Sequence, residues 1–301
     1  MIEPAALRAL IAVRDCGTVA AAAEALGFTP SAVSQQLKRL ERQSGGSVAE
    51  RSGRTVFLTE HGRSLADRGE RLLAELESLE HLGVAPAEEV TGTLRIVAFS
   101  TAMRGLLVPA LAGIRERAPR LRLTLDELDP WEASGRLERG AADLAVLHDW
   151  PGLSLDLPAS IESETLLEDR ADVLLPRAHP LSGSAEIAPS RLADETWVSI
   201  PAGAICHAWL LRTFAGTGRQ PDIAFYDEDF STHIALVEAG AAVALVPRLG
   251  REPLPEAVVA VPAVDPVSTR VVSAAWRRSG SGSPALALVL EALRAVAADP
   301  R

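Results

Sequence analysis

The sequence lacks the short motifs that mark nucleotide, zinc and serine-nucleophile chemistry. It has no glycine-rich phosphate loop opening a helix after a strand, no Cys-x-x-Cys or His-Glu-x-x-His pattern, and no Gly-x-Ser-x-Gly elbow. The sequence therefore has no local group of residues spaced as zinc ligands. We expect no catalytic residue, no metal site and no cofactor, so an enzyme is not the favoured class.

Cysteine is scarce, and long apolar runs are missing. The two cysteines, Cys16 and Cys206, lie far apart, which predicts buried thiols in a reducing compartment and no disulfide framework; a redox switch is the alternative. No run approaches the roughly 18 apolar residues of a membrane span. The first ten residues include an early acid and no basic segment, so we expect no signal peptide. A cytoplasmic protein without a membrane partner is predicted.

Net positive charge is also lacking, yet the cations are unevenly distributed. The formal net charge is −10, whereas residues 1–62 hold seven cations and six acids, which leaves −11 for the remainder. Five of the seven cations fall between positions 38 and 54, one of them the only lysine of the chain. This local basic charge favours phosphate contact near the N-terminus and predicts an acidic body that avoids it.

Helix boundaries near the N-terminus are marked by local signals. The alanine-rich stretch from about Thr18 to Leu26 predicts a helix with a hydroxyl cap, and Gly27 allows a tight turn after it. Thr29 followed by Pro30 predicts the start of the next helix. Helix, short glycine-containing turn and helix together form the helix-turn-helix pattern.

The helix that begins at Pro30 carries two distinct faces. Val33, Leu37 and Leu40 recur at helical spacing and are expected to face inward. The opposite face groups hydroxyl, amide and cationic side chains that can bond base edges and phosphates in a major groove: Ser31, Ser34, Gln35, Lys38 and Arg42. The alternative is an ordinary solvated helix face.

Two short extended runs follow this helix. Residues 48–51 and 54–58 flank Ser52-Gly53, which predicts a small hairpin with Arg51 and Arg54 near its tip. Such a wing suits phosphate or minor-groove contact.

These residues together resemble the winged helix-turn-helix of LysR-type transcriptional regulators. The shared marks, in order along about 55 residues, are Ala22-Ala23-x-x-Leu26, Ser31-Ala32-Val33-Ser34, Gln36, Leu40-Glu41, Glu50-Arg51 and Leu58-Thr59-x-x-Gly62. The resemblance implies double-stranded promoter DNA as a partner, contacted through Pro30, Ser31, Ser34, Gln35, Arg51 and Arg54.

Residues 63–82 predict a long linker helix. Leu65, Leu72 and Leu79 repeat every seven residues, Leu76 lies between, and Gly69 weakens the matching earlier position. This spacing predicts a dimerising coiled coil, with a helix lying on its own domain as the alternative. Residues 83–92 read as a hinge. In the resembled family this helix forms the dimer, which implies an imperfect inverted repeat as the DNA site.

Beyond residue 92 predicted strands alternate with predicted helices, which indicates an α/β fold with largely parallel sheets. Ligands of such sheets bind near the carboxyl ends of strands. We expect the following residues to lie there: Ser100, Thr101, His148, Ser199, Pro201, Ala202 and Phe230. Simple helix capping is the alternative role of Ser100 and Thr101.

The resemblance extends to this region and implies a periplasmic-binding-protein-like effector domain of two α/β subdomains joined by two crossing strands. The expected domains are 1–62, a linker at 63–91, and an effector domain at 92–301. The first subdomain of the effector domain comprises about 92–165 and 268–301, and the second comprises about 166–267. The implied protein is a sequence-specific regulator that forms dimers and tetramers, binds a small-molecule effector between the subdomains and contacts RNA polymerase. A solute-binding protein, or an α/β enzyme with a fused helical head, is the competing reading.

Overall fold

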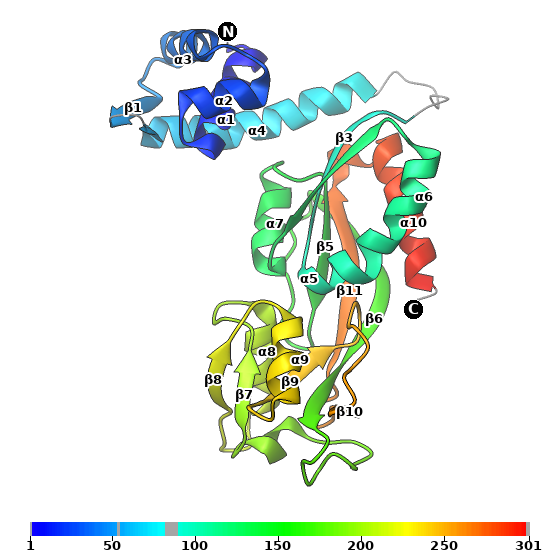
Figure 1. Cartoon of the computed structure of the whole chain (residues 1–301). Helices are drawn as coiled ribbons and strands as arrows, with labels where there is room; N and C mark the ends of the chain where they lie inside the picture. Colours follow the sequence, from blue (N-terminus) through cyan, green and yellow to red (C-terminus); the bar gives the residue numbers. More distant parts are fainter. Residues whose placement is uncertain (1, 53–54, 82–89, 299–301) are drawn as a thin grey trace. The chain divides into compact units, whose positions relative to one another are not determined.

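The structure is a computed structural model, and it describes residues 2–52, 55–81 and 90–298 of the chain. The chain divides into two compact units, one spanning Met1–Ala85 and a larger one composed of Pro86–Glu138 and Ala142–Arg301. Each is described by itself (Figure 1). Leu82 and most of the expected hinge, residues 83–89, lie outside the described residues.

The N-terminal unit is a helical domain with a small hairpin, as expected. The cap predictions are confirmed: Thr18 Oγ1 accepts from Ala21 N at 3.1 Å, and Thr29 Oγ1 accepts from Ala32 N at 3.2 Å. Gly27 ends its helix at φ +67°. The elements are α1 (Pro4–Cys16), α2 (Val19–Leu26), α3 (Pro30–Ser44), β1 (Ala49–Ser52), β2 (Thr55–Leu58) and α4 (Glu60–His81).

The linker helix α4 uses one of its faces inside this unit. Ala66 and Leu73 are buried in the same core as Leu7 of α1. A Cβ on Gly69 would lie 2.8 Å from Leu7 Cδ2, so the glycine allows α4 to approach α1 closely. Gly69 therefore has a packing role that its position in a leucine repeat did not suggest.

The second unit is built on a nine-stranded sheet. Its strands are β3 (Gly92–Ala98), β4 (Leu121–Glu127), β5 (Leu144–Asp149), β6 (Ile161–Pro176), β7 (Thr196–Ser199), β8 (Asp222–Tyr226), β9 (Val243–Pro247), β10 (Val258–Pro262) and β11 (Thr269–Arg277). Its helical segments are α5 (Ser100–Ala102), the π-helical η1 (Met103–Leu107), α6 (Val108–Arg117), α7 (Pro130–Glu138), η2 (Pro189–Leu192), α8 (Ile205–Thr213), α9 (Phe230–Glu238), η3 (Arg278–Gly280) and α10 (Pro284–Ala298).

The sheet is mixed, which corrects the expectation of largely parallel strands. The order is β4-β3-β5-β11-β6-β9-β7-β8, and β10 pairs with β6. β3 lies parallel to β4 and β5, and β7 lies parallel to β8 and β9. β6 and β11 are antiparallel to each other and to their other neighbours. The two long crossing strands are thus antiparallel, whereas the strands within each half are parallel.

Successive side chains along a strand point to opposite faces of the sheet, so each half has a hydrophobic core on both of its faces. In β3, Ile96 and its two alternate neighbours pack with α6 and α10, whereas Val97 packs with α7. In the other half, Trp197 of β7 packs on the α8 side and Val198 on the α9 side. Figure 1 shows α6 and α10 together on one side of the sheet and α7 on the other. Both faces of each half are therefore covered by helices, as parallel strands require.

The two halves meet at β6 and β11, which pair over most of their lengths. β6 runs from Ile161 to Pro176, and the π-helical η1 lies between α5 and α6. The cavity described below lies where these halves face each other.

Candidate functional site

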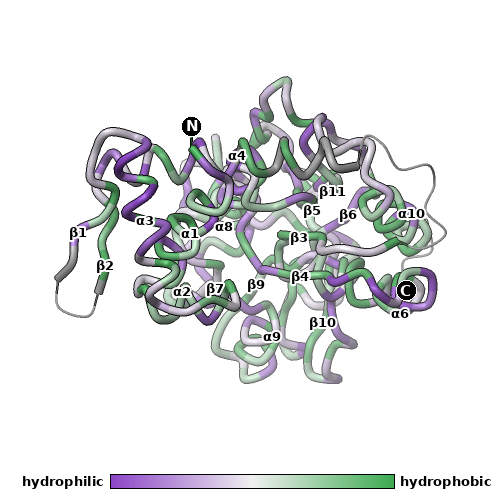
Figure 2. The backbone as a smooth tube through the Cα atoms, turned by 90° about the horizontal axis from the view of Figure 1, so that it is seen from above, coloured by the Kyte–Doolittle hydropathy of each residue, from purple (hydrophilic) through white to green (hydrophobic). Residues whose placement is uncertain are grey.

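The helix α3 has one buried and one exposed face, as its spacing predicts. Val33 and Leu40 have no exposed surface, and Leu37 is 8% exposed. Figure 2 shows α3 as mainly hydrophilic along its length. The polar face consists of exposed Pro30, Ser31, Gln35, Lys38 and Arg42, with Ser34 half-buried.

Two acids hold α3 in place. Glu3, at the start of α1, forms an ion pair with Arg39, and its backbone N–H donates to Gln43 Oε1 at 3.4 Å. Glu41 Oε1 accepts from Val48 N and from Ser47 Oγ, both at 3.1 Å. Glu41 thereby ties the segment between α3 and the hairpin to the end of α3.

The hairpin predicted as a wing is present. β1 and β2 pair antiparallel from Ala49↔Leu58 to Ser52↔Thr55. Arg51 lies in β1 opposite Val56. Arg54 lies outside the described residues.

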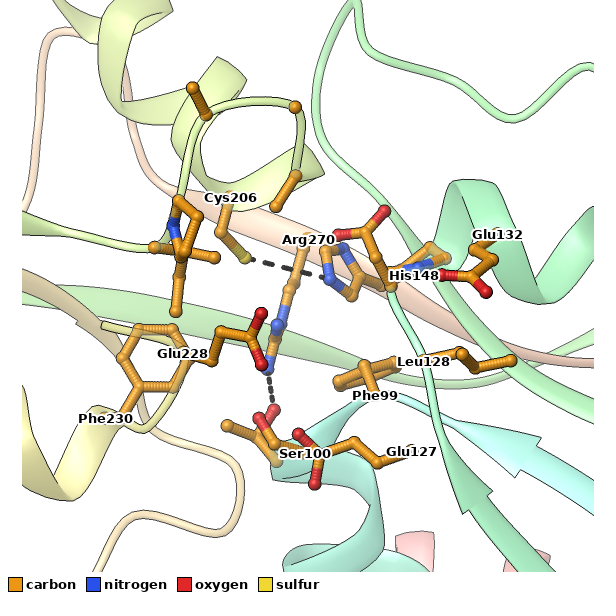
Figure 3. A pocket seen from close by; sticks show the side chains of 18 residues that line it. Phe99, Ser100, Glu127, Leu128, Glu132, His148, Cys206, Glu228, Phe230 and Arg270 are labelled. Carbon is orange, nitrogen blue, oxygen red and sulfur yellow. Dashed lines mark hydrogen bonds between the residues drawn. The ribbon is translucent and has the colours of Figure 1, made fainter. Parts of the chain in front are cut away.

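A cavity of about 400 Å³ opens in the second unit. Its walls come from the ends of β3, β4 and β5, from the segment before α8, from the start of α9 and from β11. Figure 3 shows Arg270 in the middle of the lining side chains, with Ser100 and Glu127 below it and Glu228 and Phe230 to its left. Six of the seven residues expected at an effector site line this cavity: Ser100, Thr101, His148, Pro201, Ala202 and Phe230.

Ser199, the seventh expected residue, is not one of the described residues that line the cavity. It is 4% exposed, and its hydroxyl donates to the carbonyl of Ile200 at 2.9 Å and lies 3.1 Å from His207 Nδ1. The helix at Ser100 is not capped by a side chain, because its N-cap residue is Phe99. Capping therefore does not explain Ser100.

Arg270 is the main residue that sequence reasoning missed. It is 1% exposed; its Nε donates to Asp169 Oδ2 at 2.9 Å and its Nη2 donates to Thr101 Oγ1 at 2.6 Å. Its guanidinium also lies 4.8 Å from the ring centroid of Phe99. Nη1 is buried and meets no hydrogen-bond acceptor among the described residues. No local motif points to Arg270, since Thr101 is 169 residues away in the chain.

His148 and Cys206 both line the cavity. Burial, reinforced by the charge of Arg270, lowers the pKa of His148 well below its usual range, so this imidazole is neutral. Its Nε2 lies 3.9 Å from Cys206 Sγ. Burial also raises the pKa of the Cys206 thiol to about 11, so the thiol stays protonated at neutral pH.

Four carboxyl groups line the same cavity, namely Glu127, Asp129, Glu132 and Glu228. Asp129 already accepts two backbone hydrogen bonds, from Trp131 N to Oδ1 and from Ile205 N to Oδ2, both at 3.0 Å. The second bond places a protein carboxylate at the N-terminus of α8. That position is therefore closed to an anionic ligand.

Within the described ranges, no cluster of histidine, cysteine and acidic side chains is arranged to hold a metal ion. In the same part of the chain, no helix is long and apolar enough to cross a membrane.

Comparison with known proteins assigns both units. The family described as "Bacterial regulatory helix-turn-helix protein, lysR family" matches residues 4–63, and the family described as "LysR substrate binding domain" matches residues 87–298. The chain belongs to the LysR family of transcriptional regulators. This membership confirms the expected DNA-binding regulator and the expectation that the chain is no enzyme.

Individual members of the family match this chain over nearly its whole length. The Probable HTH-type transcriptional regulator LrrA of Synechococcus elongatus is 29% identical over 298 residues, covering 98% of this chain and 97% of that protein. Full-length OxyR from Pseudomonas aeruginosa matches with a TM-score of 0.79 at 20% identity, covering 98% of both chains. CbnR complexed with its target DNA matches with a TM-score of 0.65 at 22% identity, covering 98% of this chain and 99% of that chain.

Proposed function

We propose that this regulator reads a promoter site with α3 and responds to a small molecule bound in the cavity of its second unit. The observation that carries the proposal is the exposed polar stripe of α3 opposite a fully packed face. A helix of this kind fits the major groove, where hydroxyl and amide groups bond base edges and cations bond phosphates. The residues proposed for DNA contact are Pro30, Ser31, Ser34, Gln35, Lys38 and Arg42, with Arg51 and Arg54 of the wing.

The linker helix supports dimer formation, since it has a second apolar face. Leu72 and Leu76 are 54% and 42% exposed, whereas Leu73 is 7% exposed and packs inside the unit. Large exposed leucines at coiled-coil spacing favour pairing with the same helix of a second copy. A two-fold dimer calls for an imperfect inverted repeat, and a dimer of dimers would span further half-sites.

The cavity supports a response to a small-molecule effector, in a protein that we place in the cytoplasm because its family is one of DNA-binding regulators. A ligand held between the two halves favours their closed arrangement, and it shifts the assembly only through its different affinities for the open and closed states. The altered arrangement would change the bend of the DNA and contact with RNA polymerase. Ser100, Thr101, His148, Pro201, Ala202 and Phe230 are the proposed lining contacts.

The test is a footprint of the full-length protein on the DNA upstream of its own reading frame. We expect a protected inverted repeat and binding that weakens steeply as salt rises, because counterions are released from the contacted phosphates. Ser100→Ala should bind the same site and lose the effector response. No protected site in this DNA would contradict the proposal, and normal induction in Ser100→Ala would remove Ser100 from the pocket.

A further inference from the structure

The charges around the cavity are strongly unbalanced. The described lining residues include four carboxyl groups and one guanidinium, that of Arg270, and His148 is neutral. Arg270 is already paired with the buried carboxylate of Asp169, at 2.8 Å. Asp169 offsets much of the charge of Arg270, so the acids dominate the field at the mouth of the cavity, while the guanidinium keeps a donor without an acceptor among the described residues.

Three of these acids belong to the exposed mouth of the cavity: Glu127, Glu132 and Glu228. Burial raises the pKa of Glu127, and the charges of Asp229 and Glu228 raise it further, against a lowering by Arg104. Arg104 itself pairs with Asp229 at 3.2 Å and donates to the carbonyl of Gly250 at 3.3 Å. The guanidinium of Arg104 is thus already paired with Asp229. The carboxylates at the mouth therefore keep a negative field that attracts a positively charged group.

The deep end of the cavity needs the opposite kind of group. Nη1 of Arg270 is buried on a side chain that is 1% exposed, and no acceptor for it exists within the described residues. Leaving a buried charged donor unsatisfied is costly, so an oxygen acceptor supplied by a ligand would complete the site. The Ser100 hydroxyl lines the same cavity and can donate to the same group.

We propose that the cavity takes a small zwitterion, with its carboxylate directed at Arg270 and Ser100 and its ammonium group among Glu127, Glu132 and Glu228. This inference rests on the proposed function, in which the cavity holds the effector. The volume of about 400 Å³ suits a small metabolite, and Phe99, Leu128 and Phe230 supply apolar contact for its body. A dicarboxylate is disfavoured, because its second charge would meet the acids at the mouth.

The experiment uses the full-length protein and the standard amino acids as probes, screened by thermal shift and measured by titration calorimetry. Each amino acid that binds is compared with the amine that lacks its carboxylate and with the carboxylic acid that lacks its amino group. Because a ligand that binds the folded state raises its unfolding temperature, the screen reports binding directly. Glu228→Gln tests the ammonium end, and Glu238→Gln, an exposed acid away from the cavity, is the matched control.

We expect at least one amino acid to bind, both truncated analogues to bind at least about tenfold more weakly, and Glu228→Gln to weaken binding by a similar factor while Glu238→Gln does not. Binding of carboxylic acids or dicarboxylates alone, no binding of any amino acid, or unchanged affinity in Glu228→Gln would overturn the zwitterion. Footprints measured without ligand distinguish failure of the zwitterion inference from failure of the proposed DNA-binding function. Site-specific DNA binding combined with a purely anionic ligand contradicts this inference alone, and loss of DNA binding contradicts the proposed function.

Discussion

Asp129 and Ile205 are joined by a 3.0 Å hydrogen bond, although 76 residues separate them in the chain. Asp129 lies just before α7 in the first half of the second unit, and Ile205 is the first residue of α8 in the other half. The bond therefore links the two halves at the edge of the cavity. A ligand that enters the cavity must accommodate this link or break it.

Asp129→Ala should loosen the link. The backbone N–H of Ile205 loses its acceptor, so we expect its hydrogen exchange to accelerate on the order of tenfold, which corresponds to a net hydrogen bond of about 1.4 kcal/mol. Asp149→Ala is the matched control, since Asp149 Oδ1 accepts from Leu155 N at 2.7 Å away from the link. If both variants accelerate the same amides, Asp129 has no special role between the halves.

Gly62→Ala should destabilise the N-terminal unit. A Cβ at Gly62 would lie 1.9 Å from the backbone oxygen of Val48, so the start of α4 would be forced away from the hairpin. Overpacking of this kind costs roughly 2–3 kcal/mol. Gly113→Ala in α6, where nothing lies within 4 Å, should instead stabilise its helix by about 0.5–1 kcal/mol. Thermal unfolding of both variants tests the two predictions. Equal changes in unfolding temperature would contradict the close approach of Gly62 to Val48.

Asp143→Asn should change the acid stability of the second unit. Burial opposes the charge of Asp143, but its bonds with Arg95, at 2.8, 2.9 and 3.1 Å, outweigh burial and lower its pKa below the usual range. A lowered pKa means that the stabilisation is present above about pH 4 and is lost as pH falls through the folded-state value. We expect Asp143→Asn to cost roughly 1.5–3 kcal/mol at pH 7 and to lose stability less steeply below pH 4 than the parent chain. Urea unfolding of both proteins, measured from pH 7 to below pH 4, tests this prediction. If their free energies of unfolding fall in parallel with pH, the role assigned to Asp143 is contradicted.

Cys206 should be inert towards electrophiles. Burial raises its pKa to about 11, so little thiolate exists at neutral pH, and thiolate is the reactive form. Mass spectrometry after iodoacetamide or peroxide treatment of the native protein should leave Cys206 unmodified, and Cys206→Ser should regulate normally. Stoichiometric oxidation of Cys206 in the native protein would restore the redox switch as an alternative.

The sequence predicted those features that short-range chemistry determines. Thr29 and Pro30 mark the start of α3 within a few residues, and the spacing of Val33, Leu37 and Leu40 fixes which face is buried. The leucine repeat of α4 was harder to interpret, because the helix has two apolar faces. Leu73 packs inside its own unit, as expected of a helix lying on its own domain, while Leu72 is exposed and remains available for the predicted coiled coil.

Long-range features were out of reach of the sequence. Arg270 meets Thr101 only because β11 crosses between the two halves, and no spacing within β11 signals this contact. The same holds for Asp129, whose role depends on a helix from the opposite half. Ser199 ends a strand at the expected edge of the sheet, yet its side chain is buried beside His207, which strand position alone does not predict.

The most direct test of the account measures binding of the upstream DNA by the parent chain, by Gln35→Ala and by Gln220→Ala. Gln35 is exposed on α3, whereas Gln220 is an exposed glutamine of the second unit, so the same change is made on and off the recognition surface. We predict that Gln35→Ala loses about 1–3 kcal/mol of specific affinity with its oligomeric state unchanged, and that Gln220→Ala binds as the parent does. Equal specific affinity in all three proteins would contradict the claim that α3 reads the DNA.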